Sequence, residues 1–155
     1  MKRDLHTSLK LDQVEAAQAI TTTDTSATID TRGADSVEVI IAVGVVTNIA
    51  NSPQPTWAIK LQSSPDDSAW TDVTDSNHVL INNSISPVAA PNSSTGVFCT
   101  IDGAADDAKT FRVGYVGGVR YIRVVATAAN TPGSTPYFVC ALLGHLELAP
   151  AADTV

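Results

Sequence analysis

The sequence predicts one all-β domain, an antiparallel β-sandwich or jelly roll with an extended N-terminal arm. About eight short apolar runs follow one another, each bounded by Gly, Pro, Asn or Asp, as in a sandwich. Several runs alternate apolar and polar residues, which is the period of a strand with one buried face. Between Val113 and Val125, the Gly117-Gly118 pair separates two apolar and aromatic runs and predicts a hairpin with a two-residue turn.

Length and composition fit this class and exclude others. The 155 residues suit one domain whose core needs no metal or disulfide. Nine Lys and Arg stand against sixteen Asp and Glu, a net charge of −7, so nucleic acid and anionic membrane are not expected partners. No apolar run reaches the length of a membrane span, and no signal-peptide core follows the basic residues Lys2 and Arg3. Synthesis is expected in the cytoplasm.

Residues 1–25 differ from the rest and are expected to form the arm. Residues 12–19 are the only window with helical potential, but a helix of about eight residues is marginal in water. The favoured interpretation is an arm that orders against its own sandwich or against a neighbouring molecule. The sandwich domain is placed at residues 26–148, with a first strand near 27–31, and residues 149–155 are expected to be a flexible tail.

Alternation defines the core faces of the longer strands. One strand places five residues on its core face: Val37, Val39, Ile41, Val43 and Val45. In the next, Trp57, Ile59 and Leu61 alternate with polar or small residues, which indicates a half-buried strand. Shorter strands are expected at 79–81, 97–101, 111–116, 119–127 and 137–143.

The strand that follows Gly118 has two unlike faces. Ile122, Val124 and Ala126 are expected to face the core. The other face carries Val119, Tyr121, Arg123 and Val125. A face that mixes a phenol, a guanidinium and valines is typical of a covered surface, and the cover is either another segment of the chain or a partner subunit.

Cys99 and Cys140 each lie within an apolar run and are interpreted as small buried hydrophobic residues. A disulfide between them is geometrically possible if their strands are neighbours, but a cytosolic origin argues against it. Neither has a second Cys or a His at metal-ligand spacing.

An acidic segment surrounds Trp70 and has two interpretations. Asp66, Asp67, Asp72 and Asp75 suggest a calcium loop, because Ca²⁺ takes several oxygen ligands. The spacing does not match an EF-hand, and the Asp and Ser side chains around Pro65 equally predict a turn, which is the favoured interpretation. A second acidic segment, residues 102–109, predicts a solvated hairpin loop.

Nothing in the sequence predicts an enzyme or a cofactor site. There is no Gly-x-Ser-x-Gly motif, and His6, His78 and His145 lie far apart in the chain. The glycines lie between strands and do not open a helix, so phosphate binding is not indicated.

Three blocks, in their order, resemble a family of phage proteins. These are the Ser- and Asp-rich segment 61–73, the segment 112–125 with its Gly-Gly pair, and the segment 141–145 followed by a short tail, with residues 19–33 as a lead-in. Together they resemble small virion proteins encoded beside the major capsid protein of tailed bacteriophages. The resemblance spans residues 19–148, while the start at residues 1–3 and the loops at Pro53 and Pro91 do not match it.

The resemblance implies a capsid decoration (cement) protein, a non-catalytic sandwich on the outside of an icosahedral head. Its partners would be the major capsid protein and sister copies, as a homo-trimer on local three-fold axes. The candidate partner-binding residues are Leu5, Leu9, Leu11 and Val14 of the arm, with Tyr121 and Arg123. The alternative is a carbohydrate- or host-binding module of a tail fibre or baseplate, in which Trp57 or Trp70 would stack on a sugar.

Overall fold

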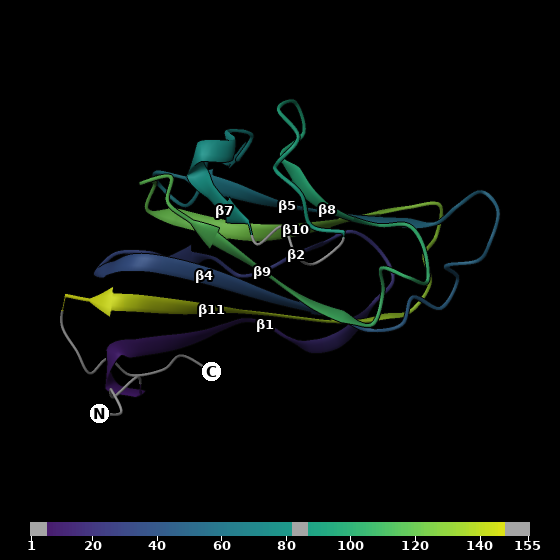
Figure 1. The fold of residues 1–155 in the computed structure, drawn as a ribbon, viewed down its shortest axis with the longest axis horizontal. Coiled ribbons are helices and arrows are strands. Elements are labelled where there is room, and N and C mark those ends of the chain that lie inside the picture. Colours follow the sequence, from purple (N-terminus) through teal and green to yellow (C-terminus); the bar gives the residue numbers. More distant parts are fainter. Residues whose placement is uncertain (1–5, 82–86, 148–155) are drawn as a thin grey trace.

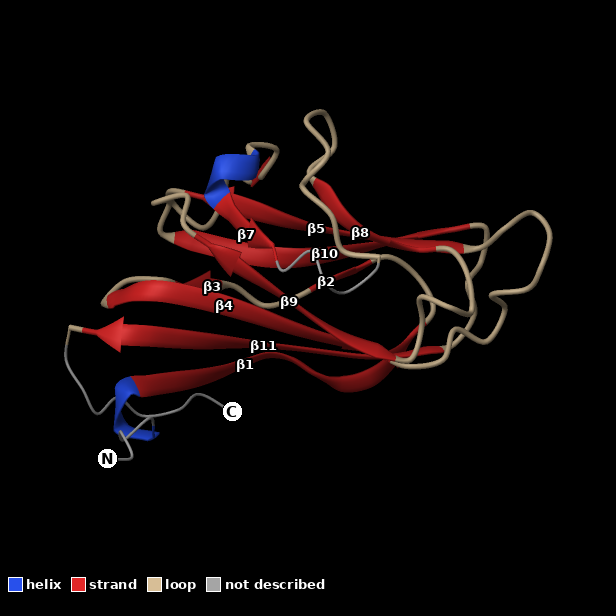
Figure 2. Ribbon diagram, in the orientation of Figure 1, coloured by secondary structure: helices blue, strands red, loops and turns tan. Residues whose placement is uncertain are grey.

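Two antiparallel β-sheets pack face to face, which confirms the predicted β-sandwich (Figure 1, Figure 2). The computed structural model describes residues 6–81 and 87–147. Residues 1–5, 82–86 and 148–155 lie outside this description, and with them Leu5 and the expected tail. No helix in the described part of the chain is long and apolar enough to cross a membrane.

We call the two layers sheet A and sheet B. Sheet A has the strand order β1 (Leu9–Ile20), β11 (Thr135–Leu146), β4 (Ala34–Val43), β9 (Lys109–Tyr115) and β7 (Val79–Ile81). Sheet B has the order β2 (Asp24–Thr25), β10 (Tyr121–Ala129), β5 (Thr56–Ser64) and β6 (Thr71–Asp72), with β3 (Ile29–Asp30) also on β10 and β8 (Val97–Ile101) also on β5. Two short 3₁₀ turns, η1 (His6–Ser8) and η2 (Ser76–His78), precede β1 and β7.

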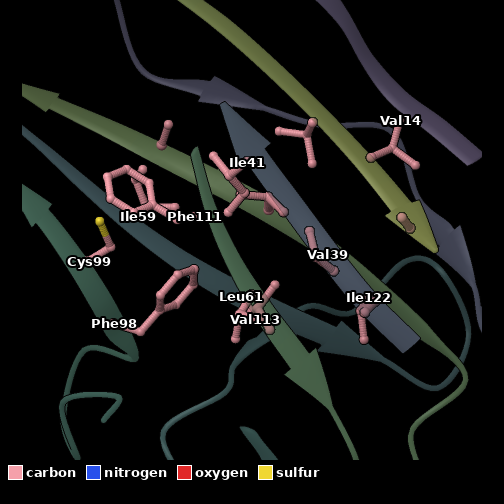
Figure 3. Close-up of a cluster of buried hydrophobic side chains, with 14 of the residues drawn as sticks. Val14, Val39, Ile41, Ile59, Leu61, Phe98, Cys99, Phe111, Val113 and Ile122 are labelled. Atoms are coloured by element: carbon pink, nitrogen blue, oxygen red, sulfur yellow. The ribbon is translucent and has the colours of Figure 1, made fainter. Parts of the chain in front are cut away.

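The core lies between the two sheets, where the predicted inward faces meet (Figure 3). Val39 and Ile41 of β4 approach Ile59 and Leu61 of β5, and all four are almost fully buried. The alternation predicted for β4 is confirmed as far as Val43. It fails at Val45, which is 62% exposed, because the strand ends at Val43 and the chain leaves the sheet.

The predicted hairpin at Gly117-Gly118 is wrong. β9 pairs with β4 and β7 in sheet A, whereas β10 pairs with β5 in sheet B, so the connection crosses from one sheet to the other. Only Gly118 has a left-handed backbone, with φ of 69°. Gly117 is needed for space instead, since a Cβ there would lie 2.5 Å from Tyr115 Oη. That hydroxyl accepts a hydrogen bond from Val119 N (3.3 Å), so Tyr115 stabilises the connection between β9 and β10.

The segment 102–109 also joins the two sheets, from β8 in sheet B to β9 in sheet A, so the prediction of a hairpin loop is wrong there too. Asp107 is not solvated but buried, and its Oδ2 accepts a hydrogen bond from Val46 N (2.9 Å). The carboxylate therefore ties this crossing to the segment that follows β4.

The expected arm contains a long strand. β1 pairs antiparallel with β11, from Leu9 opposite Gly144 to Ile20 opposite Thr135, and is an edge strand of sheet A (Figure 1). The helical alternative for residues 12–19 is wrong, whereas ordering against its own sandwich is confirmed. The physical reason is that an isolated helix of this length is marginal, while a strand gains a full ladder of hydrogen bonds from β11. The sandwich thus takes in residues from Leu9 onward.

Candidate functional site: the outer face of sheet A

Strand β11 and the second half of β4 (residues 39–43) are apolar on both of their faces. In β4 and β11, one set of alternating residues is almost fully buried against sheet B. The other set points away from sheet B; it is apolar along β11, whereas in β4 it comprises Ser36, Glu38, Ile40 and Ala42. Ile40, Phe138 and Leu142 of this set are only partly buried. Strands that read as continuous apolar runs are typical of sheets covered on both sides. Sheet A has such strands, yet sheet B is the only other layer in the described part of the chain.

We call the outward residues of sheet A face A. The strand register aligns them in rows across the sheet, and the central row runs Leu11, Leu142, Glu38, Gly114, Leu80. The remaining apolar members are Leu9 of β1, Phe138 and Cys140 of β11, and Ile40 and Ala42 of β4. Leu80, at the far edge, is 59% exposed.

Two glycines keep face A flat. A Cβ at Gly144 would lie 2.7 Å from Ser36 Oγ and 3.2 Å from Leu9 Cδ2. A Cβ at Gly114 would lie 3.1 Å from both Glu38 Oε2 and Leu80 Cβ. Neighbouring side chains therefore close over both glycines, and the face is continuous from β1 to β7.

Face A ends in a hollow at its β1 bulge. The hollow has a volume of about 680 Å³ and is lined by residues of β1, β4, β9 and β11 and of the connections beside them, including Phe138 and the exposed Val45. The register between β1 and β11 shifts here, between Glu15 and Gln18. A bulge bends the edge strand and separates it locally from its neighbour, which opens this space.

One ion pair lies on face A. Arg112 Nη1 is 3.5 Å from Glu38 Oε1, and the arginine side chain is 58% exposed. Burial raises the pKa of Glu38 above its ordinary value, and the charge of Arg112 only partly opposes this. The carboxylate of Glu38 is thus poorly solvated, although it has Arg112 as its ionic partner.

The outer face of sheet B, which we call face B, is covered by the chain's own side chains. Asp72 accepts hydrogen bonds from Lys60 Nζ and Gln62 Nε2, both 2.8 Å long. Gln62 Oε1 in turn accepts one from Arg123 Nε (2.9 Å), and the Arg123 guanidinium stacks 4.1 Å above the Trp70 ring. The sequence left open whether another segment of the chain or a partner subunit covers this face. At Arg123 the cover comes from the chain itself. The Arg120 guanidinium likewise stacks on the Tyr121 ring, with its Cζ 4.4 Å from the ring centroid.

The predicted partner-binding residues separate into three groups. Leu9 and Leu11 lie on face A, where the apolar surface is. Val14 is a core residue and offers no surface to a partner (Figure 3). Tyr121 and Arg123 lie on face B, in the contacts just described. Ile40, Phe138 and Leu142 were not predicted as surface residues, although the unbroken apolar runs 39–43 and 137–143 indicated strands with two apolar faces.

The acidic segment around Trp70 is a turn, as favoured, and its carboxylates act separately. Asp66 Oδ1 accepts hydrogen bonds from Ser68 N (3.0 Å) and Ala69 N (2.9 Å), and these backbone groups hold its pKa well below the usual range. Asp75 caps η2 through Asn77 N, and Asp67 accepts from Thr28 Oγ1. Within residues 6–81 and 87–147, no three His, Cys, Asp or Glu side chains gather as metal ligands.

The remaining candidate residues are two cysteines, Trp57 and His145. Cys99 and Cys140 are buried free thiols, and burial raises the pKa of Cys99 to about 12. Trp57 is 1% exposed and donates to Thr135 Oγ1 (3.0 Å), so it offers no ring face to a sugar. His145 Nδ1 lies 3.0 Å from Ser36 Oγ at an exposed strand end, and no carboxylate in the described residues is hydrogen-bonded to this ring.

Comparison with known proteins adds no relative. No family model matches the chain, and no curated protein matches it.

Proposed function

We propose that this protein is a capsid decoration protein of a tailed bacteriophage, bound to the outside of the head through face A. The observation that carries the proposal is the contrast between the two outer faces: polar side chains of face B bond to one another, whereas face A presents partly exposed apolar side chains on β1, β4 and β11. Protein interfaces combine apolar contacts with a few charged residues, and face A has apolar residues on β1, β4 and β11, among them Leu11 and Leu142, beside the Glu38–Arg112 ion pair. The resemblance of segments 61–73, 112–125 and 141–145 supports the phage assignment.

In this proposal the major capsid protein is the main partner, and sister copies assemble as a homo-trimer on local three-fold axes. A weak contact by each copy is sufficient, since symmetry repeats it many times over the shell. The protein stabilises capsomer contacts by covering them and carries out no catalysis. No observation favours the carbohydrate-binding alternative, since Trp57 is buried and Arg123 occupies a face of Trp70.

The test is cosedimentation of the purified protein with phage heads stripped of it. Leu142→Lys places a charge in the centre of face A, beside Glu38, which gives the lysine a partner and limits its effect on folding. Thr127→Lys is the matched control on the exposed surface of β10 in sheet B. We expect Leu142→Lys to weaken binding about tenfold or more and the control to bind like the wild type.

Two results would contradict the proposal in different ways. If the wild type does not bind stripped heads, the decoration function is wrong. If it binds and Leu142→Lys binds equally well, the function stands and face A is not the docking surface. A variant lacking residues 1–8 retains β1 and measures what the first residues add, whereas removing residues 1–25 would delete an edge strand.

A further inference from the structure

The middle of face A carries one acid and one base, and the contact between them is long. This part of the face is formed by segments 36–42, 110–114 and 138–142. Glu38 and Arg112 are the only charged residues in these segments. The distance of 3.5 Å between Arg112 Nη1 and Glu38 Oε1 exceeds the roughly 2.7–2.9 Å of a charge-assisted hydrogen bond. A hollow of about 360 Å³ lies at the pair and is lined by Glu38, Arg112, Leu80 and Ile81.

The rows of face A allow two copies of the chain to exchange this pair. Glu38 lies opposite Gly114 in the central row, and Ile40 lies opposite Arg112 in the next row. Consider two copies packed face to face about a two-fold axis that runs between these rows, perpendicular to the strands. The central row of each copy then covers the next row of the other, so that Arg112 of each copy lies over Gly114 of the other.

The carboxylate of Glu38 lies where Arg112 of a second copy would arrive. A Cβ added to Gly114 would lie 3.1 Å from Glu38 Oε2, so the carboxylate leans over the glycine. An arginine above Gly114 therefore meets Glu38 of the other copy. The two-fold axis repeats this contact, and face A is self-complementary in charge, as a contact between identical surfaces requires.

The apolar residues of face A follow the same exchange. Leu142 lies in the central row and Cys140 in the next row, so each covers the other residue in the second copy. Gly144 and Phe138 lie one row farther out, on opposite sides of the axis. The Phe138 ring of each copy therefore lies over a glycine of the other, where no side chain opposes it.

The area of face A suits a dimer of moderate strength. The face has five strands, and its long strands β4 and β11 have ten and twelve residues. With strands about 4.8 Å apart, it covers roughly 24 Å by 30 Å, or about 700 Å². Each partner in a standard protein interface contributes about 800 Å².

We propose that in solution face A forms the interface of a two-fold dimer of this chain, in which Arg112 of each copy pairs with Glu38 of the other. The inference goes beyond the proposed function, because it concerns the protein before it meets a head. The dimer covers the apolar residues until docking, when the capsid protein replaces the second copy. The net charge of −7 opposes association of two copies, and the electrically balanced middle of face A is where they repel least.

The experiment is sedimentation velocity of the purified full chain between about 1 and 200 µM, a range that brackets an expected dissociation constant of about 10 µM. We expect the wild type to shift from monomer to dimer over this range. Arg112→Glu and Glu38→Arg each place two like charges in the middle of face A, and each should raise the dissociation constant about tenfold or more. The control Thr127→Lys, on the exposed surface of β10, should dimerise like the wild type.

Mixing the two charge variants tests the contact between copies directly. Within each variant the two charges are alike, but between the variants they are opposite. An equimolar mixture of Arg112→Glu and Glu38→Arg should therefore form a heterodimer, although each variant alone stays monomeric. The heterodimer also demonstrates that both variants fold.

Three results would overturn the dimer. A wild type that stays monomeric over the whole range would exclude it. This result leaves the decoration function to its own test, since no heads are used. Self-association that Arg112→Glu and Glu38→Arg leave unchanged would place the contact on another surface. Monomeric variants whose mixture is also monomeric would show that Arg112 and Glu38 do not pair between copies.

Discussion

The two outer faces of this sandwich have the same strand geometry but opposite surface chemistry. On face B, outward residues of β5, β6 and β10 bond to one another, and Trp70 covers Arg123. On face A, Ile40 of β4 and Phe138 and Leu142 of β11 are apolar and half-buried, beside Glu38. A surface whose polar groups are already paired gains little by leaving water, whereas apolar surface gains about 25 cal/mol for each Å² buried. Face A therefore has more to gain from burial than face B.

The same contrast appears in the acids of the two faces. Burial raises the pKa of Asp72 on face B, but hydrogen bonds from Lys60 and Gln62 outweigh it and bring the pKa below the ordinary 3.8. Burial raises the pKa of Glu38 on face A above its ordinary 4.5, and Arg112 does not compensate. Face B therefore stabilises the ionised form of Asp72, whereas face A disfavours the ionised form of Glu38.

The largest effect is expected from removing the cover of face B. Arg123→Ala loses the contact with Trp70 and the hydrogen bond to Gln62, and should lower the free energy of unfolding by about 1–2 kcal/mol. Arg112→Ala, the matched change on face A, removes one exposed ion pair and should cost no more than about 0.5 kcal/mol. Urea denaturation measures both. Equal losses in the free energy of unfolding for the two variants would show that the side-chain contacts of face B stabilise the fold no more than those of face A.

A smaller effect, with a characteristic pH dependence, is expected for Asp72→Asn. The folded pKa of Asp72 is lowered, so its contribution is fully present above the unfolded value near 3.8 and is lost as the pH falls through the folded pKa. At pH 7 we expect a loss of about 1 kcal/mol. Denaturation of wild type and variant between neutral and strongly acidic pH should show the two curves converging at low pH. A difference that is constant with pH would contradict the ionic origin.

The smallest effect, of opposite sign, is expected for Glu38→Gln on face A. A raised pKa in the folded state makes folding take up protons, so the unfavourable contribution appears as the pH rises above 4.5. The variant should therefore be slightly more stable than the wild type at pH 7 and equal to it below about pH 4. Calorimetric Tm values across this range test the sign. A destabilised variant at pH 7 would mean that the Arg112 pair outweighs burial.

Much of the fold was predictable because alternation is a local property. The inward positions of β4, β5 and β10 follow from a period of two residues, and they are the residues that meet in the core. The hairpin at Gly117-Gly118 was not predictable, because two adjacent glycines permit a tight turn and a crossing between sheets equally well. The sheet in which each flanking strand pairs depends on residues far away in the chain.

The candidate site was predictable only in part. Leu9 and Leu11 were selected as arm residues and lie on face A, whereas Val14, from the same segment, lies in the core. Register decides between these positions, because one step along a strand moves a side chain to the opposite face. The bulges on either side of Glu15 shift that register again, and no sequence pattern marks them.

The all-β class and the core faces of the main strands follow from the sequence pattern, since both depend on neighbouring residues. The pairing of β1 with β11, the crossing between sheets after Tyr115, and the hydrogen-bonded cover of one outer face but not of the other arise only in the folded chain. Those outcomes depend on pairing and packing between segments distant in the chain. A local pattern specifies which residues avoid water, but the packed sheets specify which of them remain exposed.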